Sequence, residues 1–196
     1  MSEKPGPELP RPVLIVWDMQ YGIASRAFNF GDLVPRIRTL RDSFQRAGLP
    51  VIYSQHTGLP YEYMSETNIA SMKRRGLDPK SGFMAEGSKE WQIVEELRPA
   101  KEDLVLRKHT ASFFVGTMLE QMLRNRRIQT LVLAGVSTEA GIEGTARHAS
   151  YLGFRPVIVE DAVGSFDSEA NEKALWLMRR MFDVRPAESV ISAISR

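Results

Sequence analysis

The chain has 196 residues, which is long enough for one well-buried core and too short for two ordinary domains, so we expect a single domain over residues 1–196. Hydrophobic residues make up 43% and charged residues 26%, a balance typical of soluble globular proteins, and no apolar run approaches the roughly 18 residues of a membrane span. The net charge of +2 comes from interspersed charges, which argues against a nucleic-acid partner, and the absence of cysteine excludes disulfides, thiolate metal sites and thiol catalysis.

Strands and helices are expected to alternate along the chain. Residues 1–11 mix charges with prolines and have no apolar stretch of the kind found in secretory signals, so we expect a flexible tail and a cytoplasmic protein. In chain order, the apolar runs and helical spacings predict a strand at 12–17, a helix at 34–44, a strand at 51–54, a strand at 104–106, a helix from about 117, a strand at 131–134, a helix at 139–151, a strand at 157–159, a helix at 169–181 and a strand at 190–194.

This order predicts the α/β class: a three-layer, doubly wound (Rossmann-like) sheet, mainly parallel, with about six strands and helices on both faces. Active residues should then gather at the carboxyl ends of the strands, near the point where the strand order reverses. The segment 57–88 is long and irregular, which favours a lid or binding loop over a plain surface excursion. Its apolar side chains would be costly to expose, so they should pack on a second copy or close over a pocket: Tyr61, Tyr63, Met64, Met72 and Phe83.

Two charged residues follow predicted strands. Asp18 comes directly after the first strand and Lys108 ends the third. Taken alone, Asp18 could satisfy loop amides and Lys108 could face solvent. In a parallel sheet, however, both would emerge at the same edge, where a carboxylate and an ammonium can form a proton-transfer pair.

The stretch 134–146 again runs from a strand into a helix. The free amides of that helix's first turn could hold an anionic or developing oxyanion oxygen. Gly141 and Gly144 lie in its first turns, although glycine costs about 1 kcal/mol per helical position relative to alanine. Close approach of a ligand to the backbone would explain them, and tight packing of the helix on the sheet would explain them equally well.

In these residues the sequence resembles the isochorismatase-like hydrolases. The resemblance rests on four ordered blocks that span most of the chain: 14–20 (LIVWDMQ), 108–117 (KHTASFFVGT), 135–146 (GVSTEAGIEGTA) and 159–162 (VEDA). It implies a catalytic aspartate at Asp18 and a catalytic lysine at Lys108. It places the family's nucleophilic cysteine at Gly141, implies a cis peptide bond between Ser137 and Thr138, and implies a homo-oligomer, most simply a homodimer.

Glycine at position 141 removes the thioester intermediate of the cysteine members. True isochorismatases of the same superfamily also have glycine there and add water to a vinyl ether. By that resemblance, Asp18 would be a general acid, Lys108 would orient or stabilise charge, and Gly141 would leave room for substrate or water. The turn at 136–139 (VSTE) is instead of the amidase style, which argues against isochorismate itself as the substrate.

The resemblance also indicates how the pocket is lined. Nicotinamidases of the superfamily bind a metal through an aspartate and histidines just beyond the second strand, but here His56 has no second histidine nearby, so we expect no metal and no cofactor. We expect His56, Ser137 and Thr138 to contact a small-molecule substrate that can be anionic. The pocket wall would be formed by Gln20, Tyr21, Phe113 and Phe114, although core packing explains each phenylalanine equally well.

Three functions remain open at this stage. The first is Asp18- and Lys108-assisted addition of water to a small molecule, such as a vinyl ether, without a covalent intermediate. The second is carbon–nitrogen hydrolysis by water that Asp18 activates. The third is a catalytically silent protein that binds a small molecule. A protonated Asp18 would favour the first as a general acid, whereas an ion-paired, ionised Asp18 would favour the second as a general base.

Overall fold

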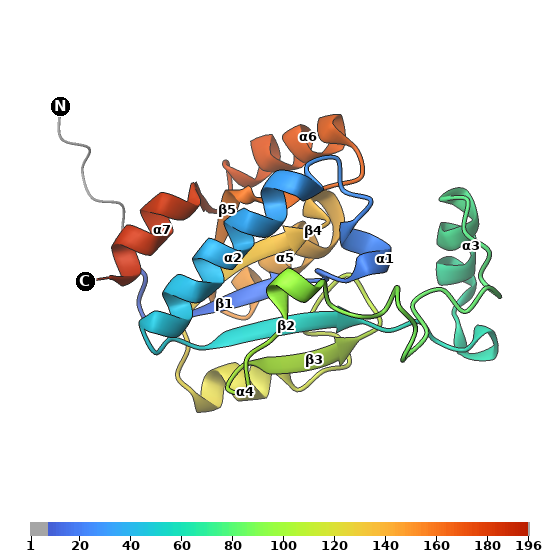
Figure 1. Ribbon diagram of the computed structural model, residues 1–196, viewed down its shortest axis with the longest axis horizontal. Coiled ribbons are helices and arrows are strands. Elements are labelled where there is room, and N and C mark those ends of the chain that lie inside the picture. The colour runs from blue at the N-terminus through green and yellow to red at the C-terminus, as the bar shows by residue number, and fades with distance from the viewer. Residues whose placement is uncertain (1–7, 196) are drawn as a thin grey trace.

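Six strands form one parallel sheet in the computed structural model, which describes residues 8–195, and the order of the strands is β3-β2-β1-β4-β5-β6 (Figure 1). The strands are β1 (Pro12–Trp17), β2 (Val51–His56), β3 (Leu104–Lys108), β4 (Thr130–Val136), β5 (Arg155–Gly164) and β6 (Asp183–Arg185). Every neighbouring pair is parallel. The strand order reverses between β1 and β4. The predicted doubly wound α/β fold is confirmed.

Helices cover both faces of this sheet because each strand alternates its apolar side chains between them. One core cluster joins Leu14 and Val16 of β1 to α2 (Phe30–Arg46) and α7 (Ala187–Ile194). The other cluster joins Val13, Ile15 and Trp17 to α4 (Leu119–Asn125), α5 (Glu143–Tyr151) and α6 (Ser168–Met178). The short elements are α1 (Tyr21–Ala24), 3-10 turns at Tyr61–Tyr63 and Glu95–Leu97, and a π-helical turn at Thr138–Ile142 that leads into α5.

One predicted strand is wrong. Residues 190–194 belong to helix α7, and the sixth strand is the three-residue β6. The apolar side chains at 187, 190, 191 and 194 have the spacing of a helix face, and Pro186 directly precedes the helix. A short apolar run is compatible with both a strand and a helix, and here the segment forms a helix that packs on α2.

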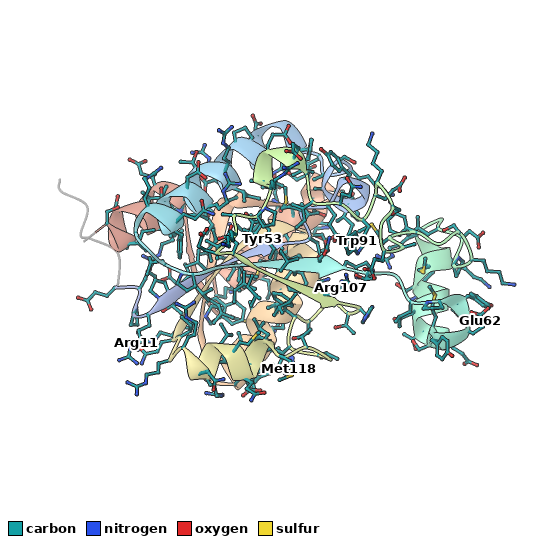
Figure 2. The ribbon with its side chains drawn as sticks, turned by 60° about the horizontal axis from the view of Figure 1, so that its bottom comes forward. Arg11, Tyr53, Glu62, Trp91, Arg107 and Met118 are labelled. Carbon is teal, nitrogen blue, oxygen red and sulfur yellow. The ribbon has the colours of Figure 1, made fainter. Side chains whose placement is uncertain are left out.

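The segment 57–88 contains a helix that the sequence pattern did not predict. Helix α3 (Glu66–Arg74) begins after Ser65, whose hydroxyl accepts a hydrogen bond from the Asn68 amide at 3.1 Å. Figures 1 and 2 show α3 standing away from the sheet, with Glu62 at the outer end of this region. None of the α3 residues is buried, so the helix has no apolar face that would appear in the sequence as helical spacing of apolar residues.

The amino-terminal residues that the structure describes lead directly into the first strand. Leu9 is buried in the core, and the Thr130 hydroxyl donates to the Pro10 carbonyl at 2.9 Å. Residues 1–7 of the predicted tail lie outside the described residues. Within 8–195, no helix is both long and apolar enough to cross a membrane. The homo-oligomer stays a prediction.

Candidate active site

A cavity of about 720 Å³ opens at the carboxyl edge of the sheet, beside the β1–β4 reversal. Parallel strands place their carboxyl ends together there, which is where ligands bind in open α/β sheets. The predicted site residues that line it are Asp18, His56, Lys108, Ser137 and Gly141. Segment 57–88 supplies its outer wall through Met64, Met72 and Phe83, among others. The long segment therefore lies over the cavity.

Asp18 is held by groups from two neighbouring strands. Its backbone has a φ of 45°, a left-handed conformation that aspartate adopts more readily than most residues. One carboxylate oxygen accepts a hydrogen bond from the Ser54 hydroxyl at 2.6 Å, and the other accepts one from Lys108 Nζ at 2.6 Å. Ser54 Oγ also accepts from the Asp18 amide at 3.0 Å. The side chain is thus fixed in orientation with a donor on each oxygen.

Lys108 is buried beneath the cavity, with a side-chain exposure of 2%. Its ammonium donates to Asp18 and to the Thr110 carbonyl, at 3.2 Å, and lies 4.4 Å from the centre of the Trp17 ring. Two of its three N–H groups thus have oxygen acceptors, and the Trp17 ring adds a cation–π contact rather than a third acceptor. The lysine therefore positions and charge-balances Asp18.

Gly141 lies against the indole of Trp17. A Cβ built on Gly141 would lie within 2.7 Å of three indole atoms, Nε1, Cε2 and Cζ2, and Nε1 would be the nearest. Real side chains do not approach so closely, so the ring fills the place of the missing side chain. The sequence pattern alone does not assign Trp17 to the site, and its position directly before Asp18 is the one signal that points to it.

The turn that carries Gly141 has a cis peptide bond. It joins Val136 to Ser137, one bond before the Ser137–Thr138 position expected from the resemblance. The bond thus lies where β4 ends rather than inside the following turn. Thr138 itself is buried away from the cavity, where its hydroxyl donates to Asn171 Oδ1 at 2.6 Å.

Four predicted wall residues lie behind the cavity rather than along it. Gln20 is buried and clamps the His56 backbone, because its Nε2 donates to the His56 carbonyl at 2.9 Å and its Oε1 accepts from the His56 amide at 2.8 Å. The Tyr21 hydroxyl accepts from the Glu95 amide at 3.1 Å. Phe113 packs edge-on against Trp17, with ring centres 5.4 Å apart, and Phe114 packs against Phe154.

Two histidines, His56 and His109, line the cavity. Burial lowers the pKa of His56 to about 4, and the nearby Lys108 charge lowers it further. His109, which the sequence reasoning did not select, lies with its Nδ1 2.8 Å from the Thr57 carbonyl. A carbonyl oxygen only accepts, so Nδ1 of His109 donates. Across residues 8–195, no three side chains of the metal-ligating types come together.

Two further arginines line the outer part of the cavity. Arg26 stacks on Phe166 at 5.1 Å, and Arg75 donates to the Ser71 carbonyl at 3.4 Å. Neither forms an ion pair with a carboxylate of the described residues. Asp18 is already paired with Lys108, and Glu139 is the other carboxylate that lines the cavity, so Arg26 and Arg75 still leave the lining with a net positive charge.

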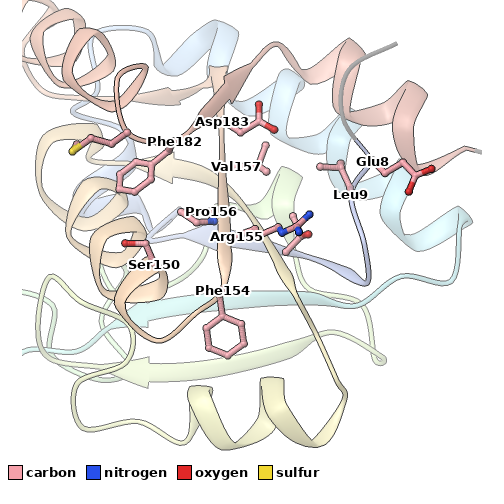
Figure 3. A pocket seen from close by; sticks show the side chains of 11 residues that line it. Glu8, Leu9, Ser150, Phe154, Arg155, Pro156, Val157, Phe182 and Asp183 are labelled. Carbon is pink, nitrogen blue, oxygen red and sulfur yellow. The ribbon is translucent and has the colours of Figure 1, made fainter.

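A second cavity, of about 380 Å³, lies at the opposite edge of the sheet (Figure 3). The amino ends of β5 and β6 line it through Arg155, Pro156 and Asp183, and Phe154 and Phe182 form apolar walls. Its Asp183 is paired with the Arg185 guanidinium, whereas among residues 8–195 the buried carboxylate–ammonium pair is Asp18–Lys108, at the other edge. The chemistry-bearing residues are therefore gathered at the carboxyl edge.

Comparison with known proteins agrees with this geometry. The family model described as the isochorismatase domain matches residues 12–189, which is most of the chain. The chain belongs to the isochorismatase family. Its relatives within this family include the isochorismatase family protein YecD of Escherichia coli O157:H7, which is 32% identical and matches over 92% of this chain and 95% of YecD.

Two other members of the isochorismatase family carry names that describe a reaction. The ureidoacrylate amidohydrolase RutB of Cronobacter sakazakii is 29% identical over 93% of this chain and 88% of RutB. The crystal structure of N-carbamoylsarcosine amidase from Thermoplasma acidophilum superposes with a TM-score of 0.72 at 28% identity, covering 90% of this chain and 96% of the amidase. Members of the family are hydrolases, and some are amidohydrolases.

Proposed function

We propose that this protein hydrolyses a carbon–nitrogen bond of a small amide or ureido compound, using water that Asp18 activates and forming no covalent intermediate. The observation that carries the proposal is the pairing of Asp18. An ammonium and a hydroxyl each donate to its carboxylate at 2.6 Å, so both oxygens act as acceptors, which is the role of a carboxylate that can take up a proton. A vinyl-ether hydrolase would need Asp18 to deliver a proton, and the ion pair opposes that.

The reaction balances without a nucleophilic side chain. Asp18 accepts a proton from water while the water oxygen attacks the carbonyl carbon, and the carbonyl oxygen takes up the negative charge. The carbon–nitrogen bond then breaks, and the proton held by Asp18 passes to the leaving nitrogen. The products are a carboxylic or carbamic acid and an amine or ammonia. Lys108 keeps Asp18 oriented through both proton transfers.

The first turn of the helical run 138–151 could stabilise the oxyanion that forms in this reaction. Its first backbone N–H groups have no carbonyl partners within the helix. Ala140 and Gly141 of this turn line the cavity, so a carbonyl oxygen placed beside them would meet backbone donors as it becomes an oxyanion. Gly141 has no side chain to keep a substrate away from that backbone.

The relatives and the charge at the mouth of the cavity support the substrate class. Ureidoacrylate and N-carbamoylsarcosine, in the names of the two relatives, both combine a ureido group with a carboxylate. Arg26 and Arg75 would attract such a carboxylate at the mouth while the ureido carbon reaches Asp18. We therefore propose small ureido acids as the first substrates to test.

The test is ammonia or amine release from a panel of ureido acids and simple amides, with Asp18→Asn as the inactive variant. General acid–base catalysis is worth about a hundredfold or more, so Asp18→Asn should lose at least that factor. Asp32→Asn, which removes an exposed carboxylate in the first turn of α2, is the matched control and should keep full activity. Turnover of a vinyl ether alone would contradict the proposal, as would undiminished turnover by Asp18→Asn.

A further inference from the structure

The indole nitrogen Nε1 of Trp17 lies directly beside Gly141, the position of the family's nucleophilic cysteine. Of the three ring atoms that a Cβ on Gly141 would overlap, Nε1 is the nearest. An oxygen that accepts a hydrogen bond from Nε1 would lie about 2.9 Å further on. Because Nε1 lies this close to Gly141, such an oxygen would lie next to residue 141.

The indole is fixed in this position. Trp17 is 1% exposed, Phe113 packs edge-on against its ring with an interplanar angle of 88°, and the Lys108 ammonium lies over its face. On the neighbouring strand Trp17 is paired in register with Gly135, where any Cβ would overlap the Trp17 carbonyl. These contacts hold the ring in one orientation at the wall of the cavity.

The Trp17 N–H faces the cavity without a partner from the chain. No hydrogen bond joins Nε1 to any residue in 8–195. Only two side-chain polar atoms of those residues are both fully enclosed and unpartnered, Asn29 Oδ1 and Tyr53 Oη, so Nε1 is not sealed in the core. Trp17 is also one of the residues that line the cavity. An indole can only donate, so its partner must be an acceptor that enters the cavity.

Water is the acceptor that also suits the neighbouring residue. The carboxylate of Asp18 lines the same cavity and can accept a hydrogen bond from a water that lies there. A water that accepts from Trp17 and donates to Asp18 keeps one lone pair free for attack. We infer that Trp17 is a positioning residue whose N–H holds the attacking water beside Asp18 and next to Gly141. This inference rests on the proposed function.

A crystal structure that resolves ordered water tests the inference without any substrate. We expect a water within about 2.7–3.2 Å of Trp17 Nε1 and of an Asp18 carboxylate oxygen. In Trp17→Phe, which keeps an aromatic ring but has no N–H, this water should be lost or displaced. An indole N–H that faces a dry contact, or a water that stays in place in Trp17→Phe, would overturn the inference even if the enzyme hydrolyses ureido acids.

Kinetics with a substrate found in the panel provide the second test. Trp17→Phe should lower kcat by ten- to a hundredfold and change KM by less than about threefold, because the N–H contacts water rather than substrate. The exposed Trp176→Phe is the matched control and should leave both constants unchanged. If Trp17→Phe fails to fold, benzothienylalanine at position 17 replaces only the N–H by sulfur. Full kcat in that variant would overturn the inference, whereas failure of the whole panel would count against the proposed function alone.

Discussion

The contact between Gly141 and Trp17 makes a sharp prediction for the substitution Gly141→Ala. Alanine adds a single methyl group, which would lie within 2.7 Å of three indole atoms. The backbone of Gly141 is not in the left-handed region, so its conformation alone would accept alanine. In an ordinary helix this substitution would gain about 1 kcal/mol. The sign of the effect therefore depends on whether the ring can yield.

We expect the overlap to dominate because the Phe113 ring and the Lys108 ammonium both pack against the indole and hold it in place. Overpacking a rigid core costs about 1–3 kcal/mol, and the methyl here meets ring atoms rather than the end of a flexible side chain. For a chain of this length, each kcal/mol lowers Tm by roughly 2–4 °C, so Gly141→Ala should melt several degrees below the parent protein. Displacing the indole should also lower the rate of hydrolysis.

Gly144→Ala is the matched control in α5. A Cβ there would have its nearest neighbour, the Ala111 carbonyl oxygen, at 3.4 Å, which is ordinary van der Waals contact. Thermal and urea unfolding followed by circular dichroism should show Gly144→Ala equal to or more stable than the parent. In a Trp17→Leu background, Gly141→Ala should cost nothing, giving a coupling of about 1–3 kcal/mol. Stabilisation by Gly141→Ala alone would refute the reasoning.

The remaining predictions concern the charged groups. Lys108→Met leaves the buried Asp18 carboxylate without its counter-charge and should cost about 3–5 kcal/mol in urea unfolding, whereas Lys173→Met, which breaks an exposed pair of the same 2.6 Å length, should cost under about 1. Equal losses would contradict the account. Burial lowers the pKa of His56 to about 4, so as the pH falls the unfolded chain takes up a proton on His56 before the folded protein does. The free energy of unfolding should therefore be unaffected by His56 above about pH 6.5 and should decrease as the pH drops towards 4. His56→Gln should make this decrease smaller. An NMR titration that found the pKa of His56 near the usual value for histidine would disprove this prediction.

Much of the site could be predicted because it follows from strand ends. Asp18 and Lys108 end β1 and β3 of a parallel sheet, so their meeting at one edge needs only the fold class. The block around Gly141 placed a third feature at that edge. These residues are adjacent to apolar runs whose period is clear, and such runs are the strongest signal in a single sequence.

The rest depends on contacts between distant segments. Trp17 continues the alternation of β1 and would be expected simply to pack in the core, and only the position of the following helix brings its indole against Gly141. Gln20 clamps the backbone of His56, 36 residues away, instead of lining the cavity. Helix α7 was mistaken for a strand because its apolar run is short.

The pH dependence of kcat/KM, measured on a ureido acid that the enzyme turns over, tests the central claim most directly. If Asp18 is the base that activates water, the rate should rise with pH to a plateau, and this rising limb should be absent from the residual activity of Asp18→Asn. A rate that instead falls as pH rises, with a falling limb that Asp18→Asn removes, would show that Asp18 acts as an acid and would contradict the account.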